Sequence, residues 1–246
     1  MTKHEEPDEA VSTQESFIMK KNTRADQVYN LIIQKVINER LFPGTPLRED
    51  HLAAEFGVSS TPVREAFRKL EQNGWLQSKP YCGSCIRHFT IEEIEELYQL
   101  READECLAIR LASDRVTEKE MKDIRDSLDA EDEYIRDSEK KGIYSPTFLT
   151  DLDFHRAIVR ASHSEALIFR NDAFAPQIKL MNLSIEMSTT LEQLRMESEE
   201  HKLIYQAFKR HWVDSAVSLL KNHLVEACHK HISTLKARLQ DRSKKA

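Results

Sequence analysis

Residues 47–83 read LREDHLAAEFGVSSTPVREAFRKLEQNGWLQSKPYCG, and the interpretation of the whole chain starts from this stretch. Gly57-Val58 interrupts an apolar-periodic segment, because glycine adopts positive φ without a steric penalty. Residues 59–62, Ser-Ser-Thr-Pro, have the composition of a helix start, with hydroxyl groups for the first amides and a proline in the first turn. Asn73-Gly74 is a typical helix end. This order of short helix, turn and second helix predicts a helix-turn-helix.

The second helix has two distinct faces. Apolar residues recur at i, i+3, i+4 and i+7 and predict a buried face of Val63, Ala66, Phe67 and Leu70. The opposite face presents Arg64 and Arg68 one turn apart, with Ser60 and Thr61 at its N-terminal end. Arginine can pair with guanine through two hydrogen bonds, so these four residues are candidates for DNA contact. The same two arginines would also occur on a charged helix face that only contacts water. DNA binding is favoured because the arginines come within the complete order of short helix, turn and capped second helix.

A hairpin is expected after this helix, with strands at residues 75–79 and 85–89 and Gly83 at its tip, in the position of a wing. Its tip contains Cys82 and Cys85 in a CxxC pattern, followed by His88. A zinc knuckle or a redox switch would use such residues. A structural zinc site needs four ligands, however, and the chain has no second CxxC. We therefore interpret the two cysteines as incidental.

Charge is segregated along the chain. Residues 20–89 carry 11 basic and 7 acidic side chains, whereas residues 90–246 carry 24 and 30, so the net charge of −6 hides a basic N-terminal region. The 5 glycines and 7 prolines in 246 residues favour a helical protein. We expect a cytoplasmic protein, because no apolar run approaches a membrane span, no signal peptide opens the chain and the four cysteines form no disulfide framework.

The helix-turn-helix stretch resembles the amino-terminal domain of the GntR family of bacterial regulators. The residues that carry this resemblance are Leu47, Leu52, Ala53, Gly57-Val58-Ser59, Thr61-Pro62-Val63-Arg64-Glu65-Ala66, Leu70 and Gly74. The resemblance implies that Arg48, Thr61, Arg64 and the wing glycine Gly83 contact DNA. Ser60 stands where the family usually has arginine, so the operator preference of the family does not carry over.

Four regions are expected: a disordered acidic tail over residues 1–22, a winged helix-turn-helix domain over residues 23–89, an all-α bundle of six or seven helices over residues 90–240, and a basic tail over residues 241–246. Pro176 should bend or interrupt the helix that begins near Glu165. Capping pairs mark further helix starts, and Ser145-Pro146 is another start signal. The pairs are Thr23 with Asp26, Thr90 with Glu93, Thr117 with Glu120, and Thr189 with Glu192.

Three histidines of the helical region lie on apolar stripes. His155 follows Asp151 by one turn, His201 is in line with Ile204 and Phe208, and His223 is in line with Leu219 and Leu220. A single inward histidine is more often a hydrogen-bonded core residue than a ligand. Burying three histidines and an aspartate without polar partners would cost several kcal/mol of folding free energy. A bound metal ion would give all four side chains a common partner. Zinc suits such a set best, with nickel, iron and manganese as alternatives.

The helical region resembles the FCD ligand-binding domain of the FadR branch of GntR regulators. The matching pieces are Leu100-Arg101 with Glu105, Asp151-Leu152-Asp153-Phe154-His155-Arg156, Glu200-His201 and His223-Leu224. The resemblance implies a divalent metal held by Asp151, His155, His201 and His223, with a small carboxylate effector completing its coordination. His163-Ser164 replaces the Gly-Asn pair common after this helix.

Two interpretations of Arg101 and Glu105 stay open. They could form an i, i+4 ion pair worth a few tenths of a kcal/mol. Alternatively they belong to the effector site, with the arginine clamping an effector carboxylate. We expect three further histidines of the helical region, His211, His229 and His231, to be exposed.

The sequence thus predicts a homodimeric transcriptional regulator, not an enzyme, that binds a double-stranded DNA operator and responds to a small carboxylate such as an organic or sugar acid. One alternative is a metal-dependent hydrolase with an appended nucleic-acid module, although no general base or nucleophile motif is evident. Another is a metal-free acyl-CoA sensor, against which the complete Asp/His set argues.

Overall fold

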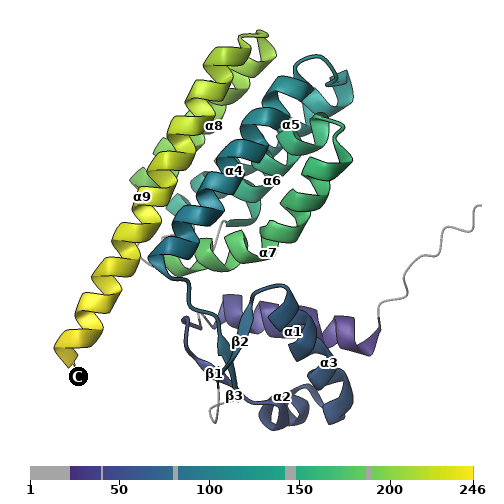
Figure 1. Cartoon of the computed structure of the whole chain (residues 1–246), viewed down its shortest axis with the longest axis vertical. Helices are drawn as coiled ribbons and strands as arrows, with labels where there is room; N and C mark the ends of the chain where they lie inside the picture. Colours follow the sequence, from purple (N-terminus) through teal and green to yellow (C-terminus); the bar gives the residue numbers. More distant parts are fainter. Residues whose placement is uncertain (1–22, 40, 80–82, 142–147, 187–189, 246) are drawn as a thin grey trace, which may run out of the picture.

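The computed structural model describes the backbone of residues 23–39, 41–79, 83–141, 148–186 and 190–245, and within these ranges the side chains of residues 79, 148–152, 184–186 and 241–245 stay outside the description. A winged helix-turn-helix lies below an all-α bundle (Figure 1). This arrangement confirms the predicted fold class. The expected acidic tail, Cys82 and the Ser145-Pro146 start signal lie outside the described residues.

The winged-helix domain contains three helices and a small sheet. Its elements are α1 (Arg24–Asn38), β1 (Pro46–Leu47), α2 (Glu49–Phe56), α3 (Ser60–Gln72), β2 (Leu76–Lys79) and β3 (Gly83–Ile86). β3 lies between β1 and β2, and both pairings are antiparallel. β1 was not expected, because two residues carry no periodicity that a sequence pattern could detect.

The buried face of α3 is the predicted one: Val63, Ala66, Phe67 and Leu70 are all buried. Gly57 adopts φ 65° at the turn, which supports the role assigned to it. Two details differ. Ser59 is the N-cap of α3 but its side chain makes no capping hydrogen bond, so extended backbone geometry alone starts the helix. In α1, the apolar spacing of Val28, Leu31, Ile32 and Val36 predicts one core face, but Leu31 is exposed and Ala25 is buried with the other three.

The bundle consists of six helices within the described residues. They are α4 (Ile91–Ala112), α5 (Glu118–Lys141), α6 (Phe148–Ala161), α7 (Glu165–Glu186), α8 (Leu191–Lys209) and α9 (Val213–Lys245). α4 packs on α6 and α9, while α8 packs on α5 and α9. All six helices contribute buried apolar side chains to the core, including Ile124 of α5 and Met181 of α7. The candidate ligand-binding residues lie on α4, α6, α8 and α9.

Helix caps follow the sequence closely. Thr23 with Asp26 and Thr90 with Glu93 form reciprocal capping boxes, and Thr117 exchanges hydrogen bonds with Glu120. The prediction at the start of α8 was wrong by one residue, since Thr190 caps the helix together with Gln193. Both adjacent threonines are followed three residues later by a side chain that can complete the box, so spacing alone could not distinguish them. The expected basic tail is helical, because α9 reaches Lys245.

α7 continues through Pro176, so the expected interruption is absent and the expected bend is present: the ribbon changes direction within α7, whose second half runs across the end of the bundle that faces the winged-helix domain (Figure 1). A Cβ atom added at Gly74 would lie 2.9 Å from Gln177 Cγ, so the bent half of α7 contacts the turn between α3 and the wing.

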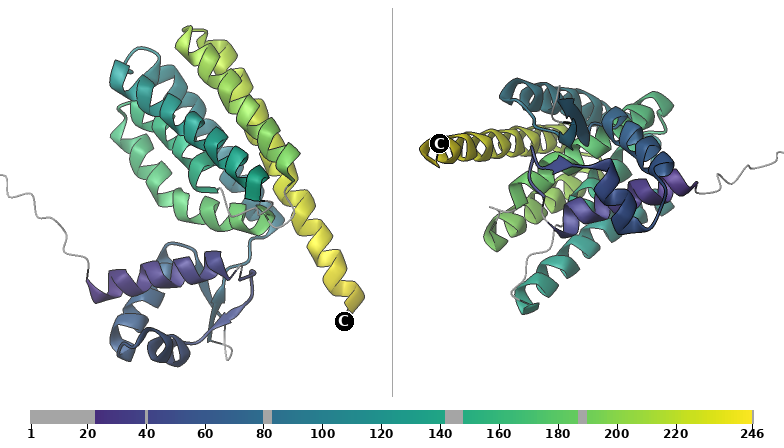
Figure 2. Two further views of the ribbon diagram at one scale, coloured as in Figure 1. Left: turned by 180° about the vertical axis from the view of Figure 1, so that it is seen from behind. Right: turned by 90° about the horizontal axis from the view of Figure 1, so that it is seen from below.

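α9 makes a second contact between the domains. It extends past the bundle beside the winged-helix domain, as the view from behind shows (Figure 2). The Arg238 guanidinium lies 5.7 Å from the centre of the Phe42 ring. Among the residues that the structure describes, no helix has the length and apolar character needed to cross a membrane.

Candidate functional site

Three histidines from three different helices meet in the bundle core. His155 of α6, His201 of α8 and His223 of α9 are buried, and their ring centroids are 4.6–5.3 Å apart. One nitrogen from each ring lies within 4.8 Å of the other two. His201 Nε2 and His223 Nε2 are 3.2 Å apart, which is about the separation of two imidazole nitrogens that share one ion at roughly 2.1 Å.

The Nδ1 atom of each of these histidines lies within hydrogen-bond distance of a glutamate carboxylate. Nδ1 of His155 lies 2.6 Å from Glu105, Nδ1 of His201 lies 3.1 Å from Glu131, and Nδ1 of His223 lies 2.7 Å from Glu200. A carboxylate acceptor places the ring proton on Nδ1, which leaves Nε2 with its lone pair for a ligand bond. Ligating histidines in metalloproteins have this arrangement, and its threefold repetition fits a divalent cation.

The ionisation of these carboxylates suits the same role. Burial alone would raise the pKa of Glu105, but the Arg101 guanidinium and then His155 outweigh burial and hold the pKa at about 2. The hydrogen bond from His223 lowers the pKa of Glu200 despite partial burial. Both groups are therefore carboxylates at neutral pH, able to accept the Nδ1 proton.

Sequence reasoning missed the part played by Glu131. This residue lies on the buried stripe of α5 formed by Ile124, Leu128 and Ile135. An acidic residue at a core position of an otherwise apolar stripe was the signal that could have identified it. Glu200 was noted only as the neighbour of His201, although its carboxylate contacts His223. The predicted ligand Asp151 lies on α6 one turn before His155, and its side chain is outside the described residues.

Arg101 and Glu105 form the i, i+4 ion pair, with Arg101 Nε 2.9 Å from Glu105 Oε1. The pair is not the solvated one considered from the sequence, because its side chains are only 4% and 2% exposed. Glu105 joins Arg101 to His155, so the arginine and the histidine cluster belong to one buried polar network.

The expectation for His231 was wrong. His211 and His229 are exposed, but His231 is buried with Nδ1 3.1 Å from the Tyr98 hydroxyl. α9 runs along α4 beyond the histidine cluster, so the inward face of α9 continues past His223 to His231.

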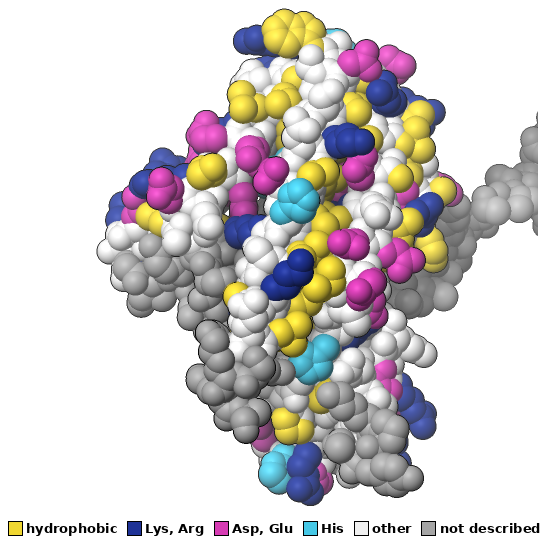
Figure 3. Space-filling view, turned by 60° about the vertical axis from the view of Figure 1, so that its left-hand side comes forward, with side chains coloured by type: hydrophobic (Ala, Val, Ile, Leu, Met, Phe, Trp, Pro, Cys, Tyr) yellow, Lys and Arg dark blue, Asp and Glu magenta, His cyan; other side chains and the backbone are white. Residues whose placement is uncertain are grey.

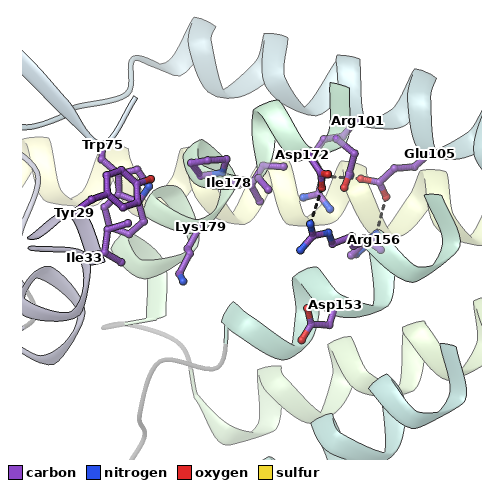
Figure 4. Close-up of a pocket in the computed structure, with 14 residues that line it drawn as sticks. Tyr29, Ile33, Trp75, Arg101, Glu105, Asp153, Arg156, Asp172, Ile178 and Lys179 are labelled. Atoms are coloured by element: carbon purple, nitrogen blue, oxygen red, sulfur yellow. Dashed lines mark hydrogen bonds and ion pairs between the residues drawn. The ribbon is translucent and has the colours of Figure 1, made fainter. Parts of the chain in front are cut away.

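A pocket of about 410 Å³ opens beside this network (Figure 4). Its polar end contains Arg101, Glu105 and His155 together with Asp153 and Arg156 of α6. The other end is apolar and includes residues of the winged-helix domain. Those residues are Tyr29, Ile33 and Trp75.

The predicted DNA contacts lie on the surface of the winged-helix domain. Ser60, Thr61 and Arg68 are exposed. Arg64 is 61% exposed and its Nε lies 3.4 Å from Glu49, while Arg48 pairs with Asp50 at 2.7 Å. Gly83 is exposed with φ 75°, and a Cβ built on it would meet no atom of the described residues within 4 Å. A phosphate backbone could approach these groups without rearrangement of the domain.

Comparisons with known proteins agree on both parts of the chain. The profile of the gntR family of bacterial regulatory proteins matches residues 24–86, and that of the FCD domain matches residues 96–226. A probable D-xylose utilization operon transcriptional repressor of Paenarthrobacter nicotinovorans is 30% identical over 83% of this chain and 87% of its own length. The gluconate operon transcriptional repressor of Bacillus licheniformis is 26% identical over 71% of each chain. The solved structure of Escherichia coli McbR/YncC has the same fold, with a TM-score of 0.71 and 20% identity over 87% of this chain and 99% of that one.

Proposed function

Since the chain belongs to the GntR family of bacterial regulatory proteins and carries an FCD domain, we propose that it represses transcription until a small carboxylate binds at a divalent metal in the bundle. The chain is a DNA-binding transcriptional regulator, as its relatives are, and not an enzyme. We further place it in the FadR branch, on the ground of the FCD domain, and in the cytoplasm, where a bacterial regulator meets its operator.

The observation that carries the proposal is the histidine cluster with its three glutamates. His155, His201 and His223 would hold the ion, with Asp151 as a fourth ligand. A divalent ion supplies a positive centre that attracts a carboxylate. Arg101 lies in the same network at the polar end of the pocket, where its guanidinium can receive a second oxygen of that group. The effector would be a small organic acid or sugar acid, and one relative is named for the gluconate operon.

DNA would be bound by two copies of the chain. Arg48, Ser60, Thr61, Arg64, Arg68 and Gly83 are proposed to contact the operator in each copy. Figure 3 shows a stripe of hydrophobic side chains along one face of the bundle. The groove between α4 and α9 is lined by Tyr98, Leu224, Val225 and Ile232, among others, and Leu107 of α4 is 47% exposed. A second copy covering this face would bury that apolar surface.

Two histidines of α9 provide the test. His223→Ala removes a proposed ligand, whereas His229→Ala changes an exposed histidine of the same helix. We expect elemental analysis to find one divalent ion per chain in the wild type and in His229→Ala, and none in His223→Ala. In a thermal-shift series, gluconate and related acids should raise the Tm only of the metal-loaded proteins.

The opposite outcome is equally clear. Equal metal content in the two variants would contradict metal binding by the histidine cluster. A Tm increase caused by acids in metal-free wild-type protein would favour a sensor that works without an ion.

A further inference from the structure

The pocket beside the histidine cluster joins the two domains. Its walls come from α4, α6 and α7 of the bundle and from α1 and Trp75 of the winged-helix domain. Figure 4 shows Arg101 and Glu105 at one end, Tyr29, Ile33 and Trp75 at the other, and Lys179 between them. We infer that this pocket takes an amphipathic acid, whose carboxylate lies beside Arg101 and His155 and whose apolar tail packs on Tyr29, Ile33 and Trp75. This inference rests on the proposed function for the head of the ligand and adds the tail.

The chemistry of the lining changes along the pocket. The charged groups Arg101, Glu105, Arg156 and Asp172 lie at the bundle end. Arg156 pairs with Asp172 at 2.9 Å, and its Nε atom is buried without a hydrogen-bond partner among the described residues. An acidic ligand oxygen can supply that partner. The far end is lined by Tyr29, Ile33 and Trp75, the last only 1% exposed, and these side chains favour an apolar group. A ligand that is polar throughout, or apolar throughout, would match only one of the two ends of the pocket.

Lys179, in the middle of the pocket, is half-buried. Burial lowers the pKa of Lys179, and the nearby charge of Asp153 partly offsets this effect. Desolvation of this kind strengthens both the hydrophobic contact and the ionic contact of a bound molecule. A volume of about 410 Å³ accommodates a small organic acid with a tail, and exceeds what acetate needs.

The apolar end lies directly against the DNA-reading unit. The Tyr29 hydroxyl accepts a hydrogen bond of 2.9 Å from the side-chain Nδ2 of Asn73, the C-cap residue of α3. Trp75 follows two residues later, where the chain leaves α3 for the wing. A ligand tail on Tyr29 and Trp75 would therefore touch the residues that set the position of the recognition helix relative to the bundle. Its binding energy would depend on that position, as allosteric control requires.

The experiment uses metal-loaded, full-length protein with Trp212→Phe, so that Trp75 is the one remaining tryptophan. Acetate serves as the head-only probe, and a series from phenylacetate to 8-phenyloctanoate supplies tails of increasing length. Calorimetry measures the affinity and Trp75 emission reports contact at the far end. We expect the affinity to rise about tenfold or more once the tail reaches the apolar end, together with a shift of Trp75 emission.

Ile33→Gln should reduce that gain to less than about threefold and leave acetate binding unchanged. Ile37→Gln is the matched control, since Ile37 lies one turn further along α1, is half-buried and does not line the pocket. Loss of the gain in both variants would mean general damage to α1, and it would overturn the assignment. Equal affinity for acetate and every tailed acid would overturn the inference while leaving the proposed function standing. Failure of gluconate, acetate and every tailed acid to bind would remove the proposed function itself.

Discussion

Two arginine–glutamate pairs show how differently the two domains use the same chemistry. Arg64 and Glu49 of the winged-helix domain are 61% and 38% exposed and 3.4 Å apart. Arg101 and Glu105 of the bundle are 4% and 2% exposed, 2.9 Å apart, and held by further hydrogen bonds. Water competes for the first pair and leaves it easily exchanged for a phosphate. Water does not compete for the buried second pair, so this pair fixes the positions of the Arg101 and Glu105 side chains.

The largest expected effect comes from breaking the buried pair. Glu105→Ala leaves the Arg101 guanidinium buried without its carboxylate and should lower the free energy of unfolding by about 3–5 kcal/mol. Urea denaturation followed by circular dichroism in the presence of a chelator measures this without a contribution from metal loss. Glu102→Ala on the same helix is the control, because its partner Lys221 is 56% exposed, and it should cost no more than about 1 kcal/mol. Equal destabilisation by the two changes would contradict the contrast between buried and exposed pairs.

An intermediate effect, on DNA and not on folding, is expected at Arg64. Arg64→Ala should weaken binding to an operator fragment by about 1–3 kcal/mol and reduce the salt dependence of binding by about one phosphate contact. The free energy of unfolding should stay within about 0.5 kcal/mol of the wild type. Fluorescence anisotropy over a salt series gives both binding quantities. Arg24→Ala, an exposed arginine outside the recognition helix, should bind like the wild type, and the DNA assignment fails if Arg64→Ala does so too.

The smallest effect is expected at the partner of Arg64. Glu49→Ala removes the acidic member of the exposed pair and should change the free energy of unfolding by less than about 1 kcal/mol. Operator binding should become slightly tighter, because Arg64 is released and a carboxylate is removed from a surface that faces phosphates. The same anisotropy assay measures it. Weaker binding by Glu49→Ala would show that the pair positions Arg64 for DNA instead of competing with it.

Much of the fold follows from local sequence signals. The buried face of α3, the turn at Gly57 and the caps at Thr23, Thr90 and Thr117 depend on residues within one or two helical turns. Periodicity and capping act over that range, so a sequence pattern can specify them. The failures were also local. Two adjacent threonines competed for one cap at Thr190, and the two-residue strand β1 is too short to have a pattern.

The candidate site was accessible to sequence reasoning only in part. His155, His201 and His223 could be chosen because each interrupts an apolar stripe, and the stripe predicts that it points inward. The pairing of each histidine with its own glutamate was not predictable, since Glu131 and His201 lie 70 residues apart and meet only through the packing of α5 on α8. The same holds for His231, whose burial depends on how far α9 follows α4.

The sequence by itself determined that a basic helix-turn-helix precedes an acidic helical bundle, and that the apolar face of α3 and the histidines His155, His201 and His223 point inward. Those properties depend on residues close together in the chain. Tertiary structure alone decided that three imidazoles from α6, α8 and α9 share one centre, and that a pocket connects this centre with Tyr29 and Trp75 of the winged-helix domain. The physical reason is that helix crossing angles and the bend of α7 arise from packing among many residues distant in sequence, and these set where inward side chains meet.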